Sequence, residues 1–123
     1  MLADAADPLH ESAAASRDEW LRQGAVLIST DFVMDETLTL LRMRLGLAVA
    51  ERWWDLVQGS SRVVWETIDA ARADRARAWF FRWQDKRFSF TDCTSFVVMK
   101  ERRIRTALTS DRHFEQAGFQ IAP

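Results

Sequence analysis

Apolar and polar residues follow one another in blocks that predict short strands between longer amphipathic helices. Residues 25–28 form a wholly apolar run, Ala-Val-Leu-Ile, which is typical of a strand buried on both faces. The Ser-Thr pair that ends this run is a good cap for a helix expected over residues 31–45, which stops at Gly46. A second helix is expected over residues 47–58, before a Gly-Ser-Ser turn.

The rest of the chain continues this alternation. The other expected elements are a helix from Asp7 to Gly24, a strand at 63–65, a helix over 68–83, a helix opened by Ser89 or Thr91 and ending near Arg102, and strands at 105–108 and 119–121. Strands that alternate with helices favour an α/β sandwich with a mainly parallel sheet.

Length and composition fit one globular domain. The chain has 123 residues, of which 48% are hydrophobic, so we expect a single domain over residues 1–123 with a core of its own. No apolar run approaches the roughly 18 residues that a membrane span needs, and the N-terminus lacks a secretory pattern. We therefore expect a cytoplasmic protein that does not enter a membrane.

The residue types narrow the candidate chemistry. One cysteine excludes an internal disulfide, and two histidines are too few for the usual Cys/His zinc site, so carboxylates would have to hold any metal. Lysine and arginine number 17 against 18 acidic residues, which leaves a formal net charge of -1. No global field draws such a protein onto nucleic acid, and binding of that kind would be local.

Glu36 is the first candidate carboxylate, because it lies on the apolar side of its predicted helix. At about 100° per residue it shares a face with Phe32, Val33, Leu40 and Met43. Asp35 lies on a polar face and serves as a control. An acid among apolar neighbours needs a partner such as a metal, although Glu36 could also extend to solvent or pair with an arginine.

Asp92 and Asp111 are two further candidates. Asp92 lies in the first turn of a predicted helix, where a carboxylate is also a simple cap. Asp111 follows the predicted strand at 105–108, at the edge where open α/β sheets bind ligands, and it could instead cap the turn that follows. Each is explained by capping when taken alone.

Glu36, Asp92 and Asp111 can converge at one edge of one sheet. Clustered carboxylates repel one another unless a divalent cation neutralises them, and oxygen ligands suit Mg²⁺ or Mn²⁺. Such ions activate water and hold phosphoryl oxygens. Hydrolysis of a phosphodiester is therefore the natural reaction for a site of this kind.

Three segments in the same order resemble the acidic motifs of PIN-domain proteins, the nuclease fold of VapC-type toxins. They are Asp-Glu-Thr at 35–37, Ser-Phe-Thr-Asp-Cys-Thr-Ser-Phe at 89–96 and Leu-Thr-Ser-Asp-Arg-His-Phe at 108–114, and Asp-Pro-Leu-His-Glu at 7–11 resembles the start of the family's first long helix. The resemblance spans nearly the whole chain and implies a three-layer sandwich. It also implies Glu36, Asp92 and Asp111 as Mg²⁺ or Mn²⁺ ligands, with the Thr91 hydroxyl supporting them.

By the same resemblance the activity is metal-dependent endoribonuclease cleavage of RNA, restrained by a partner antitoxin, and a homodimer is expected. The family pattern begins with an apolar strand that carries an aspartate, and residues 1–6 do not match it. A start placed too far downstream, a truncation, or a strand supplied by another chain are three explanations of this difference. A misplaced or shortened start is the explanation that we favour.

Other residues have structural explanations that we prefer. The aromatic residues Phe80, Phe81 and Trp83 resemble an interface more than a base-binding platform, and Trp53-Trp54 are expected to pack outer helices. The arginines of 72–87 are expected to form a solvated face, although they could guide a phosphate backbone. His113 is expected to stabilise a turn rather than to transfer protons, and Cys93 to be a small buried residue.

Two rival functions remain open at this point. One is a catalytically silent PIN-fold module that keeps affinity for an antitoxin or RNA without the full set of acids. The other is a phosphatase or DNA-directed nuclease, because the same metal chemistry serves all phosphodiesters.

Overall fold

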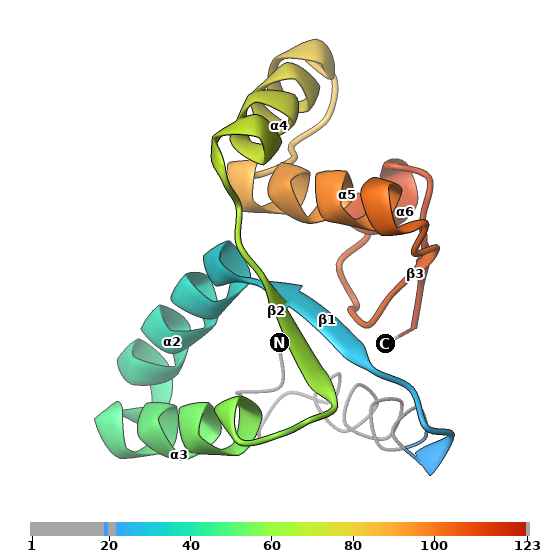
Figure 1. Cartoon of the computed structure of the whole chain (residues 1–123). Helices are drawn as coiled ribbons and strands as arrows, with labels where there is room; N and C mark the ends of the chain where they lie inside the picture. Colours follow the sequence, from blue (N-terminus) through green and yellow to red (C-terminus); the bar gives the residue numbers. More distant parts are fainter. Residues whose placement is uncertain (1–18, 20–21, 123) are drawn as a thin grey trace.

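A computed structural model describes residue 19 and residues 22–122 of the chain. The elements in chain order are β1 (Leu27–Thr30), α2 (Asp31–Leu45), α3 (Leu47–Gln58), β2 (Val63–Glu66), α4 (Ala70–Arg82), α5 (Phe90–Arg102), β3 (Thr106–Ala107), α6 (His113–Gln116) and β4 (Gln120–Ile121). Helices therefore alternate with parallel strands, and the expected α/β class is confirmed (Figure 1). Within these residues no helix has the length and apolar character required to span a membrane.

The four strands form two parallel pairs. β1 pairs with β2, with Leu27 opposite Val63 and Thr30 opposite Glu66. β3 pairs with β4, with Thr106 opposite Gln120. In the described part of the chain no strand is hydrogen-bonded between β1 and β3, so the mainly parallel central sheet appears as two separate pairs.

The first strand differs from the apolar run that predicted it. β1 begins at Leu27, and Val26 before it is 50% exposed, so the expectation of a strand at 25–28 buried on both faces is wrong. The reason is a side chain: the Arg62 guanidinium donates to the Ala25 carbonyl from Nε at 3.1 Å and from Nη2 at 2.9 Å. That carbonyl is thereby satisfied outside the strand ladder.

Caps set the boundaries of the helices. The Thr30 hydroxyl accepts the Val33 N–H at 3.1 Å, and α2 and α3 have the bounds expected for them. Gly46 joins the two helices at φ 93°, a backbone conformation that favours glycine. α4 begins two residues later than expected, because the Asp69 side chain caps it by accepting the Arg72 N–H at 2.9 Å.

The N-terminal helix expected from Asp7 lies almost wholly outside the described residues. Its end is visible: the Gln23 N–H donates to the Glu19 carbonyl at 3.1 Å, and Gly24 follows with φ 85°. The strands expected at 105–108 and 119–121 are present but shorter, at two residues each.

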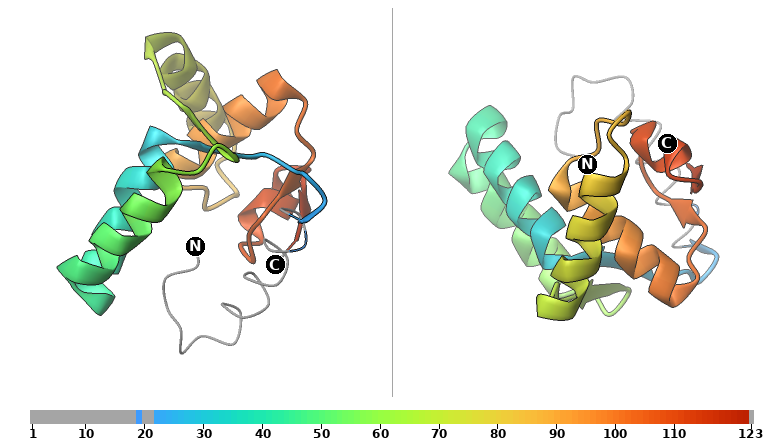
Figure 2. Two further views of the ribbon diagram at one scale, coloured as in Figure 1. Left: turned by 60° about the horizontal axis from the view of Figure 1, so that its bottom comes forward. Right: turned by 90° about the horizontal axis from the view of Figure 1, so that it is seen from above.

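Phe96 is the centre of the core that joins α4, α5 and α6. Its ring is fully buried and lies with centroids 5.0–5.6 Å from four other aromatic rings. These four rings are Trp79, Phe88, Phe114 and Phe119. Figure 2 shows α4 crossing α5, and the cluster also includes Phe114 of α6. Buried aromatic rings of this size supply much of a small core's stability.

A second group of aromatic residues packs α3 against the β1–β2 strand pair. Trp53 and Trp54 of α3 contact Trp65 of β2, with ring centroids 6.4 and 6.1 Å apart. The packing role expected for Trp53 and Trp54 is therefore confirmed.

Candidate acidic site at the start of α5

Asp92 is held in place by the first turn of α5. The Ser89 hydroxyl accepts the Asp92 N–H at 2.9 Å, and Asp92 Oδ2 accepts the Ser89 N–H at 3.0 Å. This reciprocal capping box identifies Ser89, rather than Thr91, as the cap. The helix N-terminus favours a negative charge here, and only 14% of the Asp92 side chain is exposed.

Asp111 follows β3 and organises the turn into α6. Its N–H donates to Thr109 Oγ1 at 3.0 Å, and its Oδ1 accepts the His113 N–H at 2.9 Å. This is the capping role that was considered for Asp111 from the sequence. The same hydrogen bond holds the backbone of His113 next to Asp111.

The structure brings Asp92 and Asp111 together through His113. His113 Nδ1 lies 3.0 Å from Asp92 Oδ2 and 3.4 Å from Asp111 Oδ1. The ligand atoms of the three residues all lie within 4.8 Å of one another, although 21 residues separate Asp92 from His113. We call these three residues the acidic site.

His113 has a larger part in this arrangement than the sequence suggested. Its backbone N–H stabilises the turn, as expected, but its ring also reaches the two carboxylates. The ring stands edge-on to Phe88, with centroids 5.8 Å apart. Its position two residues after Asp111 was the only signal in the sequence, and that signal fits a turn equally well.

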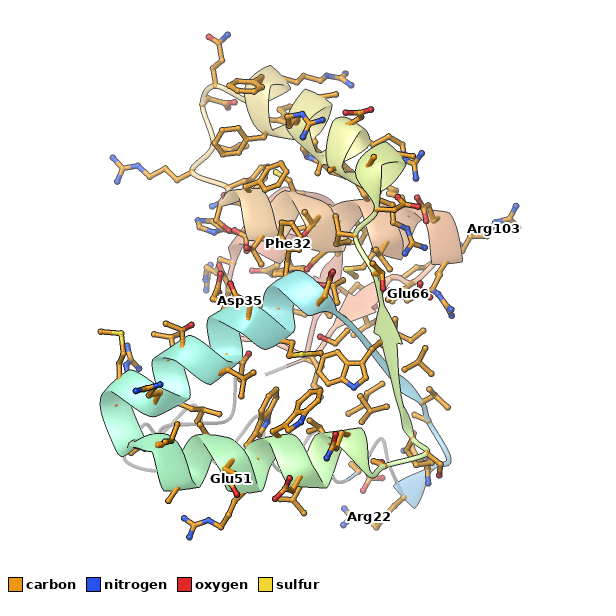
Figure 3. The ribbon with its side chains drawn as sticks, turned by 60° about the vertical axis from the view of Figure 1, so that its left-hand side comes forward. Arg22, Phe32, Asp35, Glu51, Glu66 and Arg103 are labelled. Atoms are coloured by element: carbon orange, nitrogen blue, oxygen red, sulfur yellow. The ribbon has the colours of Figure 1, made fainter. Side chains whose placement is uncertain are left out.

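Glu36 lies on α2 and is not part of this group. One helical turn before it, Phe32 contacts Phe90 at the start of α5, with centroids 5.9 Å apart (Figure 3). Residues four apart share a helix face, so Glu36 follows Phe32 on that side of α2. Glu36 thus belongs to the helix that meets α5 beside Asp92.

The reason given for selecting Glu36 does not hold in the structure. Its side chain is exposed, as is that of Asp35, so burial does not distinguish the two. Met43 on the supposed apolar face is 79% exposed, whereas Phe32, Val33 and Leu40 are half-buried, so this face is only partly covered. The ligand role implied for Glu36 by the PIN-domain resemblance stays a prediction.

The two residues that follow Asp92 on α5, Cys93 and Thr94, are fully buried. Cys93 is fully buried, as expected, and burial raises the pKa of its thiol to about 11, with a smaller contribution from the Asp92 charge. The Thr91 carbonyl accepts the Thr94 hydroxyl at 2.6 Å. The Thr91 hydroxyl itself makes no hydrogen bond with any described residue, so its support of the carboxylates stays a prediction.

Comparison with known proteins identifies the family. The family model of the PIN domain matches residues 5–120. The chain belongs to the PIN-domain family. This PIN domain is 33% identical over 120 residues to the 23S rRNA-specific endonuclease VapC20 of two Mycobacterium tuberculosis strains, covering 96% of the chain and 87% of the relative. A crystal structure of VapC20 from that species, a sarcin-ricin loop cleaving toxin, matches with a TM-score of 0.84 and 32% identity, over 96% of this chain and 88% of the other.

Proposed function

We propose that this PIN domain is a divalent-metal-dependent endoribonuclease of the VapC toxin type. The observation that carries the proposal is the acidic site, in which Asp92, Asp111 and His113 present ligand atoms within 4.8 Å of one another. The relationship to VapC20, an endonuclease, supports nuclease activity on RNA.

The residues of the acidic site fit a divalent cation. Two carboxylates and an imidazole nitrogen form a donor set that Mn²⁺ accepts, and Mg²⁺ would use the carboxylate oxygens. Asp92 and Asp111 would hold the ion, with Glu36 of α2 as a further acid. Such an ion, when bound, supplies an activated water and neutralises phosphoryl oxygens.

The protein's own residues would prepare the site for this chemistry. The Ser89 N–H donates to the Asp92 carboxylate, and the N-terminus of α5 favours a negative charge at this position beside Asp111. His113 Nδ1 faces both carboxylates and can hold or release a proton there. Phe88 packs against the imidazole ring and limits its movement.

The proposal includes the partners expected from the resemblance. Apolar side chains are exposed along α2 and α3, among them Met43 at 79%, Leu47 at 59% and Leu56 at 75%. An antitoxin protein or a second copy of the chain would cover such a surface. We also keep the proposal that the protein acts in the cytoplasm.

A catalytically silent binding module is the second candidate. The observation that favours it is the position of Glu36 outside the acidic site, which leaves two carboxylates rather than three within the described cluster. A module of this kind would bind RNA without cutting it.

RNA cleavage with Mg²⁺ or Mn²⁺ tests both candidates. Asp92→Asn and Asp111→Asn should each reduce cleavage at least about 100-fold, since losing even a residue behind a metal ligand costs about 10–100-fold. Glu36→Gln should give a comparable loss. Binding of Mn²⁺ alone, measured by titration calorimetry, should weaken in the same variants.

Two matched controls separate these effects from changes in the fold. Asp35→Asn removes the neighbouring charge on α2, and Asp69→Asn alters a capping aspartate on α4, so both should cleave like the wild type. Equal loss in Glu36→Gln and Asp35→Asn would contradict the role of Glu36. A wild-type protein that binds RNA and Mn²⁺ without cutting would establish the binding module instead.

A further inference from the structure

An open cavity of about 500 Å³ lies beside the aromatic core, apart from the acidic site. Its lining comes from three elements: Arg75, Trp79, Arg82 and Trp83 from α4 and its C-cap, Lys100 from α5, and Ala117 after α6. This volume is within the range of ligand-binding pockets. We call this cavity the cationic pocket, because it is lined by three basic residues and by no acidic one.

Two of its cations are free to meet a ligand. Arg75 pairs with Glu101, so its charge is already partly neutralised. Arg82 and Lys100 form no ion pair with any residue that the structure describes; their charged ends lie over aromatic rings instead. The other arginines of α4 differ, since Arg72 binds Glu66 and Glu101 and Arg77 binds Asp74.

The aromatic side of the pocket is flat and partly open. The Arg82 guanidinium lies 5.3 Å from the centroid of the Trp83 ring, and 40% of Trp83 is exposed. Nucleic-acid bases stack on guanidinium planes and on aromatic rings. Trp79 also lines the pocket, and its buried Nε1 has no hydrogen-bond partner among the described residues.

The pocket and the acidic site share two elements of the fold. Lys100 follows Asp92 by eight residues along α5, a rise of about 12 Å. α6 also connects the two places, because it begins at His113 of the acidic site and ends next to Ala117 of the pocket. A single extended strand of RNA can therefore reach both places.

We propose that the cationic pocket binds one nucleotide of the RNA substrate, a short distance along the strand from the bond that is cut. Arg82 and Lys100 hold a phosphate, and the base stacks on the layer formed by Arg82 and Trp83. The inference rests on the proposed ribonuclease function. The sequence had assigned Phe80, Phe81 and Trp83 together to an interface. Trp83 instead lines the pocket, whereas Phe80 and Phe81 do not.

Binding of a short fluorescein-labelled single-stranded RNA, followed by fluorescence anisotropy in EDTA, tests the pocket without cleavage. The double variant Arg82→Gln/Lys100→Gln should bind at least about ten-fold more weakly at low salt. Its plot of log affinity against log salt concentration should be shallower by about 0.7, because the contact with one phosphate is lost. Trp83→Leu should bind at least about five-fold more weakly with an unchanged slope.

The matched control removes two exposed arginines outside the pocket. Arg52→Gln/Arg77→Gln carries the same change in charge and should keep the wild-type affinity to within about two-fold. Circular dichroism checks that all variants fold. Equal weakening in the two double variants overturns the proposal, and so does unchanged RNA binding in the pocket variant. Loss of binding to polyglutamate instead of RNA would show that the pocket is a protein-binding site.

Cleavage of the same RNA with Mn²⁺ separates this inference from the proposed function. The pocket variant should raise KM for the RNA while leaving cleavage of a dinucleotide unchanged, since a dinucleotide cannot reach both places. If the wild type cleaves RNA and the pocket variant matches it in binding and KM, the inference fails and the function stands. If the wild type binds RNA through the pocket but never cleaves it, the function fails and the nucleotide site stands.

Discussion

The acidic site and the cationic pocket lie toward opposite ends of α5 and gather charges of opposite sign. At the acidic site, Asp92 and Asp111 lie together with His113 between them. At the pocket, Arg82 and Lys100 have no carboxylate partner among the described residues. Both regions rest on one shared ring, that of Phe96: Phe88, which contacts His113, packs on it, and so does Trp79, which lines the pocket.

The difference shows how a polyanion would approach the protein. A phosphate backbone is attracted to the pocket and repelled by the two carboxylates. It can occupy the acidic site only when cations neutralise the carboxylates there. The two regions would therefore have different roles: the pocket would bind the RNA strand, and the acidic site with its ion would cleave it.

Removing the shared support should damage both regions at once. Phe96→Ala is expected to lower the free energy of unfolding by about 3–5 kcal/mol, because it empties the centre of the aromatic core. Urea denaturation measures this loss. The same change at Phe81, which is 68% exposed, should cost no more than about 0.5 kcal/mol. A loss below about 1 kcal/mol for Phe96→Ala would mean that the two regions are supported independently.

Arg72 and Arg102 differ from Arg82 of the pocket, because each of them pairs with a carboxylate. Breaking these ion pairs tests what such pairing contributes to stability. Glu66 at the end of β2 binds Arg72 of α4 and Arg102 of α5 (Figure 3). Glu66→Gln should lower the free energy of unfolding by about 1.5–3 kcal/mol near neutral pH, as expected for hydrogen bonds to charged groups. Urea denaturation over a range of pH measures the difference between the two proteins.

The pH dependence of that difference has a definite sign. The hydrogen bond from Arg72 holds the pKa of Glu66 below its ordinary value, and Arg102 acts in the same direction against burial. The stabilisation is therefore complete above the pKa of glutamate in the unfolded chain, about 4.3. It is lost as the pH falls through the lower pKa of the folded protein. A difference that grows on acidification would contradict this assignment.

The smallest expected effect is on the reactivity of Cys93, which is buried directly after Asp92 of the acidic site. The Cys93 thiol, with its pKa raised to about 11 by burial and then by the Asp92 charge, stays protonated at neutral pH. Alkylation by iodoacetamide should be slow in the folded protein and should increase with pH up to about 11 without an earlier plateau. Asp92→Asn should lower the pKa slightly, because it removes the lesser of the two causes. A fast reaction at neutral pH would show that this interior is open.

The sequence predicted the elements whose ends are marked by local chemistry. Thr30 and Gly46 set the limits of α2 and the start of α3, and Ser89 sets the start of α5. The first strand was misplaced because a distant side chain, that of Arg62, takes the Ala25 carbonyl. Hydrophobic pattern carries no information on a contact of that range.

The sequence predicted those residues of the site whose positions follow from the order of helices and strands. Asp92 and Asp111 each follow an element boundary, and the fold brings those boundaries together. Glu36 was chosen because its helix face looked apolar, but its own side chain is exposed, and the contacts of the His113 ring were missed because a turn already explained its position. The cationic pocket could not be predicted, since its residues come from three elements whose crossing no local pattern specifies.

His113 is the first residue of α6, and Ala117 directly follows its last residue. This helix makes only about one turn and is packed against the core through Phe114, so it cannot stretch. An RNA strand held at both places would be cut at a constant offset from the captured nucleotide. The length of this short helix would then help to set the number of nucleotides between the captured nucleotide and the bond that is cut. Inserting residues into α6 would shift the position of the product's end.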